Sequence, residues 1–171
     1  MSLRNRLMCL IILFVAAAPQ NFSNPVQSLG AVCSIPSTPC STKYSFEDYQ
    51  LPFKIKQQLT VGRSYKSASF YAVVLASLPA QDEAGECSHI KESARLEAQA
   101  LFTERKVFAS HFECAEELIL YTSVNQSFNF MAIYAGATRS EANKMLGRVR
   151  ATGRFPAANI RRMQVVLEFS T

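Results

Sequence analysis

The stretch FMAIYAGATRSEANKMLGRV, residues 130–149, contains the signals of a strand, a tight turn and a helix. Its first part is apolar, β-branched and aromatic, which favours a buried strand. Thr138 is a suitable N-cap, and Glu141 three residues later completes the pattern of a capping box. Apolar residues then recur at helical spacing: Ala142, Met145, Leu146 and Val149. The stretch therefore predicts a strand that turns directly into an amphipathic helix.

A second strand and helix lie upstream. SFYAVVLASL, residues 69–78, is a continuous apolar run typical of a central strand. Ser88 is placed to cap a helix that we expect to run to about Arg105. The strand-like segments KVFASHF and ELILYTSV follow, and we expect the second to form a hairpin with the strand in the opening stretch. NIRRMQVVLEF, residues 159–169, closes the chain as a further strand.

The order strand, helix, strand, strand, helix, strand defines the expected fold class. It predicts an α+β domain with a βαββαβ order, in which a four-stranded antiparallel sheet carries two helices on one face. RNA-binding modules share this ferredoxin-like order, but they present exposed aromatic residues within K/R-G-F-G-F-V-x-F. That string does not occur in this sequence. We therefore predict no nucleic-acid partner.

The amino-terminal residues predict export. Arg4 and Arg6 precede an apolar run, residues 7–18, that is too short to span a bilayer, and together they resemble a signal peptide over residues 1–18. We expect cleavage and no stable membrane span, and the alternative is an uncleaved membrane anchor. Residues 19–66 are expected to form a Ser- and Pro-rich linker and an amino-terminal extension, in which FKIKQQLTV could add an edge strand, so the expected domain covers residues 67–171.

Composition narrows the function classes. The chain of 171 residues is 49% hydrophobic and 18% charged, which fits a packed globular protein. Without the two signal-peptide arginines, 16 basic and 13 acidic residues remain, a net charge of +3 that does not demand an anionic partner. No serine triad, paired-carboxylate hydrolase pattern or phosphate loop is present. We therefore expect a protein that is not an enzyme and needs no cofactor.

Four cysteines remain after loss of Cys9 with the signal peptide. An even number in an oxidising compartment predicts two disulfides, although four cysteines allow three connectivities. The stretch CSIPSTPC favours a local loop between Cys33 and Cys40, which leaves Cys87 to pair with Cys114.

Both histidines of the chain lie near the second predicted pair, in the stretches CSH and HFEC. Two cysteines and two histidines are a possible zinc ligand set, here Cys87, His89, His111 and Cys114. However, C-x-H and H-x-x-C are not common zinc spacings, and an oxidising compartment favours the disulfide. We therefore predict a disulfide and no metal, with zinc as the alternative.

At this point the sequence resembles a SPOR domain, an exported repeat module of bacterial cell-division proteins, over roughly residues 67–171. Tyr71–Leu78, YAVVLASL, is similar to the family's first strand, aromatic-x-V-Q-L-G-S-F. Tyr134–Ala137 followed by Ser140–Ala142 is similar to its V-G-P-F-like turn and s-x-x-E-A helix. RVRATGRFPAANI is similar to its passage into the last strand.

The resemblance implies a periplasmic or secreted bacterial protein that binds peptidoglycan glycan strands, stripped of their peptides, through an open sheet face. Ser77 keeps the serine of the family's first strand, whereas Val74 replaces its glutamine. Tyr121 and Tyr134 lie on strand segments from which they could stack on sugar rings. The expected ligand-binding residues are thus Ser77, Tyr121 and Tyr134. The alternative is a protein-interaction or inhibitor domain of the envelope that has lost glycan binding.

Overall fold

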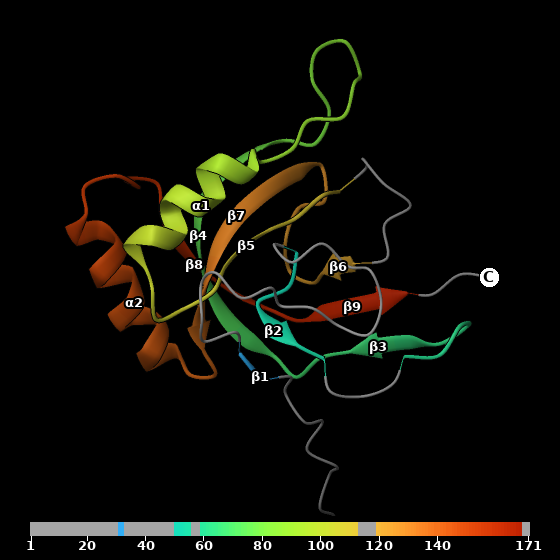
Figure 1. The fold of residues 1–171 in the computed structure, drawn as a ribbon, viewed down its shortest axis with the longest axis horizontal. Coiled ribbons are helices and arrows are strands. Elements are labelled where there is room, and N and C mark those ends of the chain that lie inside the picture. Colours follow the sequence, from blue (N-terminus) through green and yellow to red (C-terminus); the bar gives the residue numbers. More distant parts are fainter. Residues whose placement is uncertain (1–30, 33–49, 56–58, 113–118, 169–171) are drawn as a thin grey trace, which may run out of the picture.

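The computed structural model describes residues 31–32, 50–55, 59–112 and 119–168. Its main sheet has four antiparallel strands. Two helices, α1 (Glu92–Leu101) and α2 (Arg139–Ala151), cover one side of this sheet, called here the helix side (Figure 1). The α+β fold with a ferredoxin-like βαββαβ arrangement is confirmed. The strands, in their order across the sheet, are β5 (Val107–Ala109), β7 (Phe128–Gly136), β4 (Phe70–Pro79) and β8 (Asn159–Met163).

The turn from β7 into α2 forms as predicted. The Thr138 hydroxyl accepts a hydrogen bond from the Glu141 amide at 3.3 Å, and the Glu141 carboxylate accepts one from the Thr138 amide at 3.0 Å. Gly136 ends the strand with φ +109°, and a Cβ there would lie 2.6 Å from the Glu141 side chain. A side chain at this position would therefore collide with the capping box, which explains the glycine.

The first helix begins later than predicted. Lys91 is its N-cap and gives no side-chain hydrogen bond, so the expected cap at Ser88 does not form. Residues 80–88 instead build a projecting hairpin, called here the arm (Figure 1). The Asp82 side chain holds its tip by accepting hydrogen bonds from the amides of Ala84 and Glu86, both at 2.9 Å. Ser88 instead closes the arm, since its amide donates a hydrogen bond to the Ala80 carbonyl at 2.8 Å.

A second, three-stranded sheet lies on the other side of the main sheet, called here the second side (Figure 1). The predicted hairpin between ELILYTSV and the next strand is wrong, because β5 pairs with β7 in that position. The predicted closing strand is divided at Gln164, and its two parts belong to different sheets. The three strands, in their order, are β3 (Ser64–Lys66), β9 (Val165–Glu168) and β6 (Ile119–Tyr121).

The packed region begins upstream of the expected boundary at residue 67. A short pair of strands, β1 (Ala31–Val32) and β2 (Phe53–Lys54), precedes β3. Leu51, Phe53 and Tyr65 are buried in the core of the second side, so part of the expected amino-terminal extension belongs to the fold. The predicted signal peptide lies outside the described residues. Among the described helices, none is both long and apolar enough to cross a membrane.

Candidate functional site

The second side of the main sheet is not open to a ligand where the two tyrosines lie. Tyr121 is 2% exposed and Tyr134 is 5% exposed. The ring of Tyr121 stacks on Phe108 with centroids 5.5 Å apart, and its hydroxyl donates a hydrogen bond to the carbonyl of Gln50. Tyr134 stacks on Phe70 at 5.6 Å. The expectation that these rings face a sugar is therefore corrected, because both rings are buried in the core of the second side.

The surroundings of Tyr134 determine the pKa of its phenol. The Arg105 guanidinium lies over the ring, 5.9 Å from its centroid. Burial raises the pKa of Tyr134, and the nearby charge of Arg105 opposes part of this rise. The phenol thus stays neutral at physiological pH, and the residue acts as part of the core with a cation over its face.

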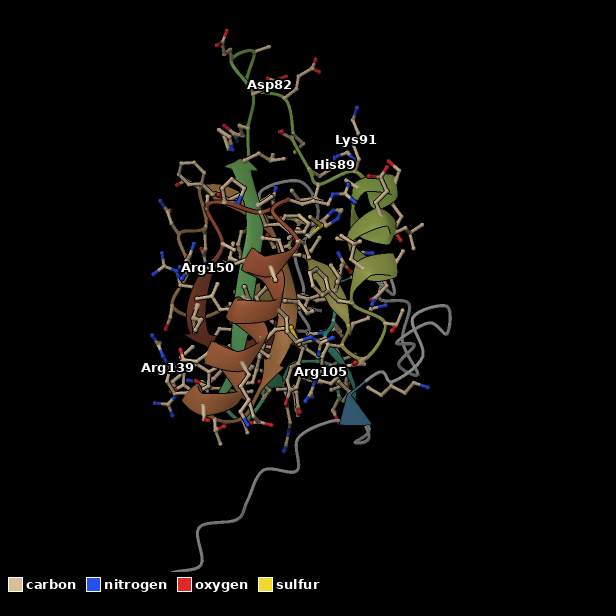
Figure 2. All side chains as sticks on the ribbon, turned by 90° about the vertical axis from the view of Figure 1, so that its left-hand side faces the viewer. Asp82, His89, Lys91, Arg105, Arg139 and Arg150 are labelled. Carbon is tan, nitrogen blue, oxygen red and sulfur yellow. The ribbon has the colours of Figure 1, made fainter. Side chains whose placement is uncertain are left out.

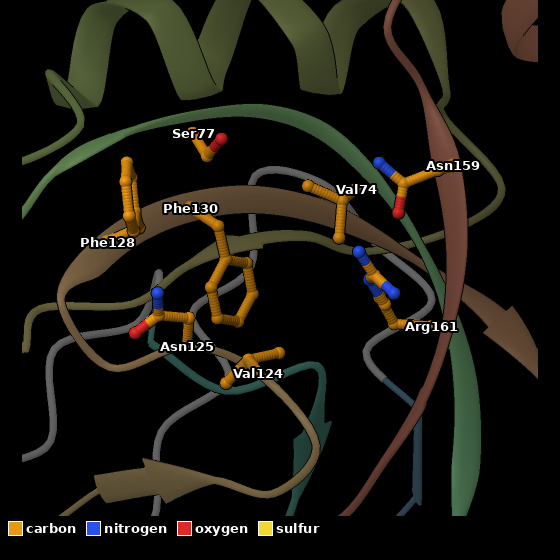
Figure 3. A pocket seen from close by; sticks show the side chains of 8 residues that line it. All are labelled: Val74, Ser77, Val124, Asn125, Phe128, Phe130, Asn159 and Arg161. Atoms are coloured by element: carbon orange, nitrogen blue, oxygen red, sulfur yellow. The ribbon is translucent and has the colours of Figure 1, made fainter.

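Ser77 is exposed and lines a pocket at the end of the second side. A bulge in β4 between Val74 and Ala76 shifts the register, so that Ser77 pairs with Phe130 and faces the second side. The pocket has a volume of about 310 Å³ and is called here the sheet pocket (Figure 3). Its lining residues are Val74, Ser77, Val124, Asn125, Phe128, Phe130, Asn159 and Arg161.

Two strands, β4 and β8, and the loop between β6 and β7 bring the polar groups of the sheet pocket together (Figure 3). Asn125 lies in the loop between β6 and β7, and its Oδ1 accepts a hydrogen bond from the Ser127 amide at 3.0 Å, which leaves its amide nitrogen for a ligand. Asn159 and Arg161 come from the edge strand β8. Phe128 is 42% exposed, an unusual position for a large aromatic residue. An apolar ring beside amides, a hydroxyl and a guanidinium suits a polyhydroxylated ligand with an apolar face.

Of the three predicted ligand residues, only Ser77 belongs to this pocket. Sequence reasoning missed Phe128, Asn125 and Asn159, because Asn125 lies in the loop between β6 and β7 and the other two are the first residues of β7 and β8. One signal was present: the loop NQSF combines polar turn residues with an aromatic residue that no helical or strand pattern requires.

The two segments that contain the histidines lie side by side. The rings of His89 and His111 stack with centroids 5.6 Å apart and an interplanar angle of 21°. Burial lowers the pKa of His111, the charge of His89 lowers it further, and Glu92 opposes these effects. Cys87 is exposed at the base of the arm, where its backbone pairs with that of Gln81 in an isolated antiparallel β-bridge. Cys114 lies outside the described residues.

The cysteine pairing therefore stays a prediction. Cys33 and Cys40 also lie outside the described residues, so the same holds for the proposed local loop. In the part of the chain that the structure describes, no group of three or more His, Cys, Asp or Glu side chains is arranged to hold a metal ion.

Charges divide between two regions of the molecule. Asp82 marks the acidic tip of the arm, whereas Arg139 and Arg150 lie along α2 (Figure 2). Several arginines are neutralised within the fold, as in the Arg148–Glu104 pair at 2.6 Å. Among the described residues, Arg161 and Arg162 on β8 form no ion pair. These two guanidiniums are thus available to an anionic ligand.

No family model, curated protein or solved structure matches this chain.

Proposed function

We propose that this chain is an exported, non-catalytic binding module of the bacterial cell envelope, and that it holds a peptidoglycan glycan strand at the sheet pocket. The observation that carries the proposal is the exposed ring of Phe128 beside Ser77, Asn125 and Asn159 in one pocket. The resemblance to SPOR domains supports the ligand class. The pocket differs from an open sheet face, because only the end of the second side remains accessible.

The chemistry of the sheet pocket supports binding of a sugar. A pyranose ring presents an apolar face that packs on an aromatic ring, and hydroxyls that need donors and acceptors around its edge. Phe128 supplies the ring, Ser77 both donates and accepts, and Arg161 donates. The volume of about 310 Å³ is at the lower limit for small-ligand sites. It suits one sugar unit of a strand whose neighbours extend along the surface.

The same lining supports binding rather than catalysis. The described residues around the pocket include no carboxylate, histidine or cysteine that could act as a general acid, a general base or a nucleophile. Hydrolysis of a glycosidic bond ordinarily requires two carboxyl groups on either side of the bond. A bound glycan strand would therefore dissociate without being cleaved.

Sedimentation with purified sacculi tests the proposal. The protein is expected to sediment with amidase-treated sacculi, and Phe128→Ala should weaken binding about 2- to 10-fold because it removes the stacking surface. Leu96→Ala is the matched control, because Leu96 is 49% exposed on α1, away from the sheet pocket. Equal sedimentation of Phe128→Ala and the unchanged protein would reject the pocket as the glycan site.

A protein-interaction or inhibitor domain is the second candidate, and the arm favours it. Residues 80–88 project from the fold, and the tip exposes Asp82, Glu83 and Glu86. A projecting acidic hairpin is a suitable contact for a basic protein surface. Two results together would replace the first candidate with the second. The protein would fail to sediment with sacculi, and an envelope protein that binds the unchanged chain would not bind the triple variant Asp82→Asn, Glu83→Gln, Glu86→Gln.

A further inference from the structure

A second pocket lies where the main sheet and the three-stranded sheet meet. Its walls come from the residue before β4, the turn after β6 and the junction between β8 and β9. Its volume is about 270 Å³, and it is called here the Arg162 pocket. The lining residues are Ser69, Thr122, Ser123, Arg162, Met163 and Gln164.

Hydrogen bonds hold two of the walls in place. The Thr122 amide donates to the Gln164 carbonyl at 3.0 Å, and the Gln164 amide donates to the Thr122 hydroxyl at 2.9 Å. The Gln164 side chain donates to the carbonyl of Ser67 at 2.9 Å. These bonds connect three segments that are distant in the sequence, so the pocket exists before any ligand enters.

The polar groups of this pocket favour an anion that also carries hydroxyls. Arg162 is its single charged lining residue among those described, and it forms no ion pair with a described carboxylate. Three residues with hydroxyl groups, Ser69, Thr122 and Ser123, line the same pocket. A guanidinium binds a carboxylate through two parallel hydrogen bonds, and hydroxyl side chains pair with ligand hydroxyls.

The backbone of Ser123 adds a separate observation. Its φ of +61° lies in the left-handed region, and it is the one described residue other than glycine with a positive φ. A side chain in this region costs stability relative to glycine, and such residues cluster at ligand sites. The serine at this position keeps a hydroxyl at the rim of the Arg162 pocket where glycine would be more relaxed.

We propose that the Arg162 pocket is a binding site for a small hydroxylated carboxylate, such as a sugar acid. Arg162 pairs with the carboxylate, and Ser69 and Ser123 bind the hydroxyls. A single guanidinium balances the single charge of a carboxylate better than the double charge of a phosphate. This site does not depend on glycan binding at the sheet pocket, because the two pockets share no lining residue.

Titration followed by NMR tests the proposal, with D-glucuronate as the ligand. Glucose is the neutral control, acetate is the control for charge alone, and inorganic phosphate is the control for a doubly charged anion. Glucuronate is expected to shift the amide resonances of Ser69, Thr122, Ser123 and Gln164 at lower concentration than any control. Arg162→Gln should raise Kd about tenfold or more, because it removes the charge-assisted pair.

Two further variants separate binding from folding. Arg161→Gln removes the neighbouring charge, which lines the sheet pocket instead, and should leave glucuronate binding unchanged. Ser123→Gly should weaken binding while the melting temperature stays equal or rises, because it removes the hydroxyl and the left-handed strain together.

Several results would overturn the proposal. These are shifts of equal size with glucose, tighter binding of phosphate or acetate, shifts confined to Ser77 and Asn159, or no shift in this pocket at millimolar glucuronate. Equal losses of affinity in the Arg161→Gln and Arg162→Gln variants would also overturn it, because they would indicate general attraction to a basic edge.

Discussion

The two sides of the main sheet are covered in different ways. On the helix side, two helices place their apolar stripes on Val73, Met131, Ile133 and their neighbours. On the second side, aromatic rings from segments far apart in sequence interlock: Phe53, Phe70, Phe108, Phe112, Tyr121, Phe130 and Tyr134. The helix side follows from short-range periodicity, whereas the second side depends on contacts between distant segments. This difference decides where a ligand can bind. The segments that cover the second side leave only the end of that side, at the sheet pocket, accessible.

The strongest test of this comparison is the loss of a ring from the upstream segment. Phe53 is fully buried and packs edge-to-face on Phe70 with centroids 5.8 Å apart. Phe53→Ala should lower the free energy of unfolding by about 3–5 kcal/mol, because it removes buried apolar area and leaves a cavity. Urea unfolding measures the change. Phe128→Ala, on an exposed ring, should cost about 0.5 kcal/mol or less, and equal small losses in both variants would mean that the upstream segment is no part of the fold.

The second test concerns the end of the sheet, where one side chain connects several segments. Asn129 is fully buried. Its Oδ1 accepts hydrogen bonds from the Ser110 hydroxyl and the Phe112 amide, and its Nδ2 donates to the carbonyls of Ser88 and Phe112. Asn129→Ala should cost about 2–3 kcal/mol, because it leaves buried polar groups without partners.

Asn125→Ala is the matched control for Asn129→Ala in the same urea experiment. Asn125 is exposed, and the hydrogen bond that its Oδ1 accepts from the Ser127 amide lies at the surface. We expect a loss of about 0.5 kcal/mol or less for this control. A comparable loss in both variants would contradict the role of Asn129 as the connection between the arm, β5 and β7.

The helix side and the second side also differ in how much the sequence predicted. Thr138, Glu141 and Gly136 lie within six residues, so the passage from β7 to α2 could be predicted from local chemistry. The covering of Tyr121 could not, because it depends on Gln50 and on rings distant in sequence. Ser77 was predicted at the site for its place in the first strand, but the bulge that turns it toward the pocket has no clear sequence signal. The local turn could be predicted from the sequence, whereas features that depend on pairing between distant segments could not.

The third test compares the two helix starts. Thr138→Ala removes a side-chain cap from α2 and should cost about 1 kcal/mol. In contrast, Lys91→Ser introduces a cap where α1 has none, and should stabilise the protein by about 0.5–1 kcal/mol. Thermal unfolding measures both changes. Thr103→Ala, at an exposed turn residue, is the control, and a loss in Thr138→Ala no larger than in this control would contradict the contribution of the capping box.

The smallest expected effect is a dependence of stability on pH at His111, where the base of the arm meets the segment after β5. Burial and the charge of His89 lower the pKa of His111 below its ordinary value of 6.5, and Glu92 opposes this change only in part. The unfolded chain therefore binds a proton at a higher pH than the folded one does. Stability is complete above pH 6.5 and falls as the pH decreases from 6.5 toward the lower pKa of the folded state. Below that value the loss becomes constant.

Urea midpoints at about pH 7.5 and about pH 5.5 test this, because carboxylates with ordinary pKa values remain largely ionised in that interval. The unchanged protein should lose stability between the two conditions, and His111→Gln should lose less, whatever its stability at the higher pH. His89→Gln removes the neighbouring charge but keeps the burial of His111, which is the larger cause of the lowered pKa. It should therefore retain most of the dependence. An identical loss in the unchanged protein and in His111→Gln would mean that other groups produce it, and that the stacked histidines do not couple the base of the arm to the segment after β5 through their charge.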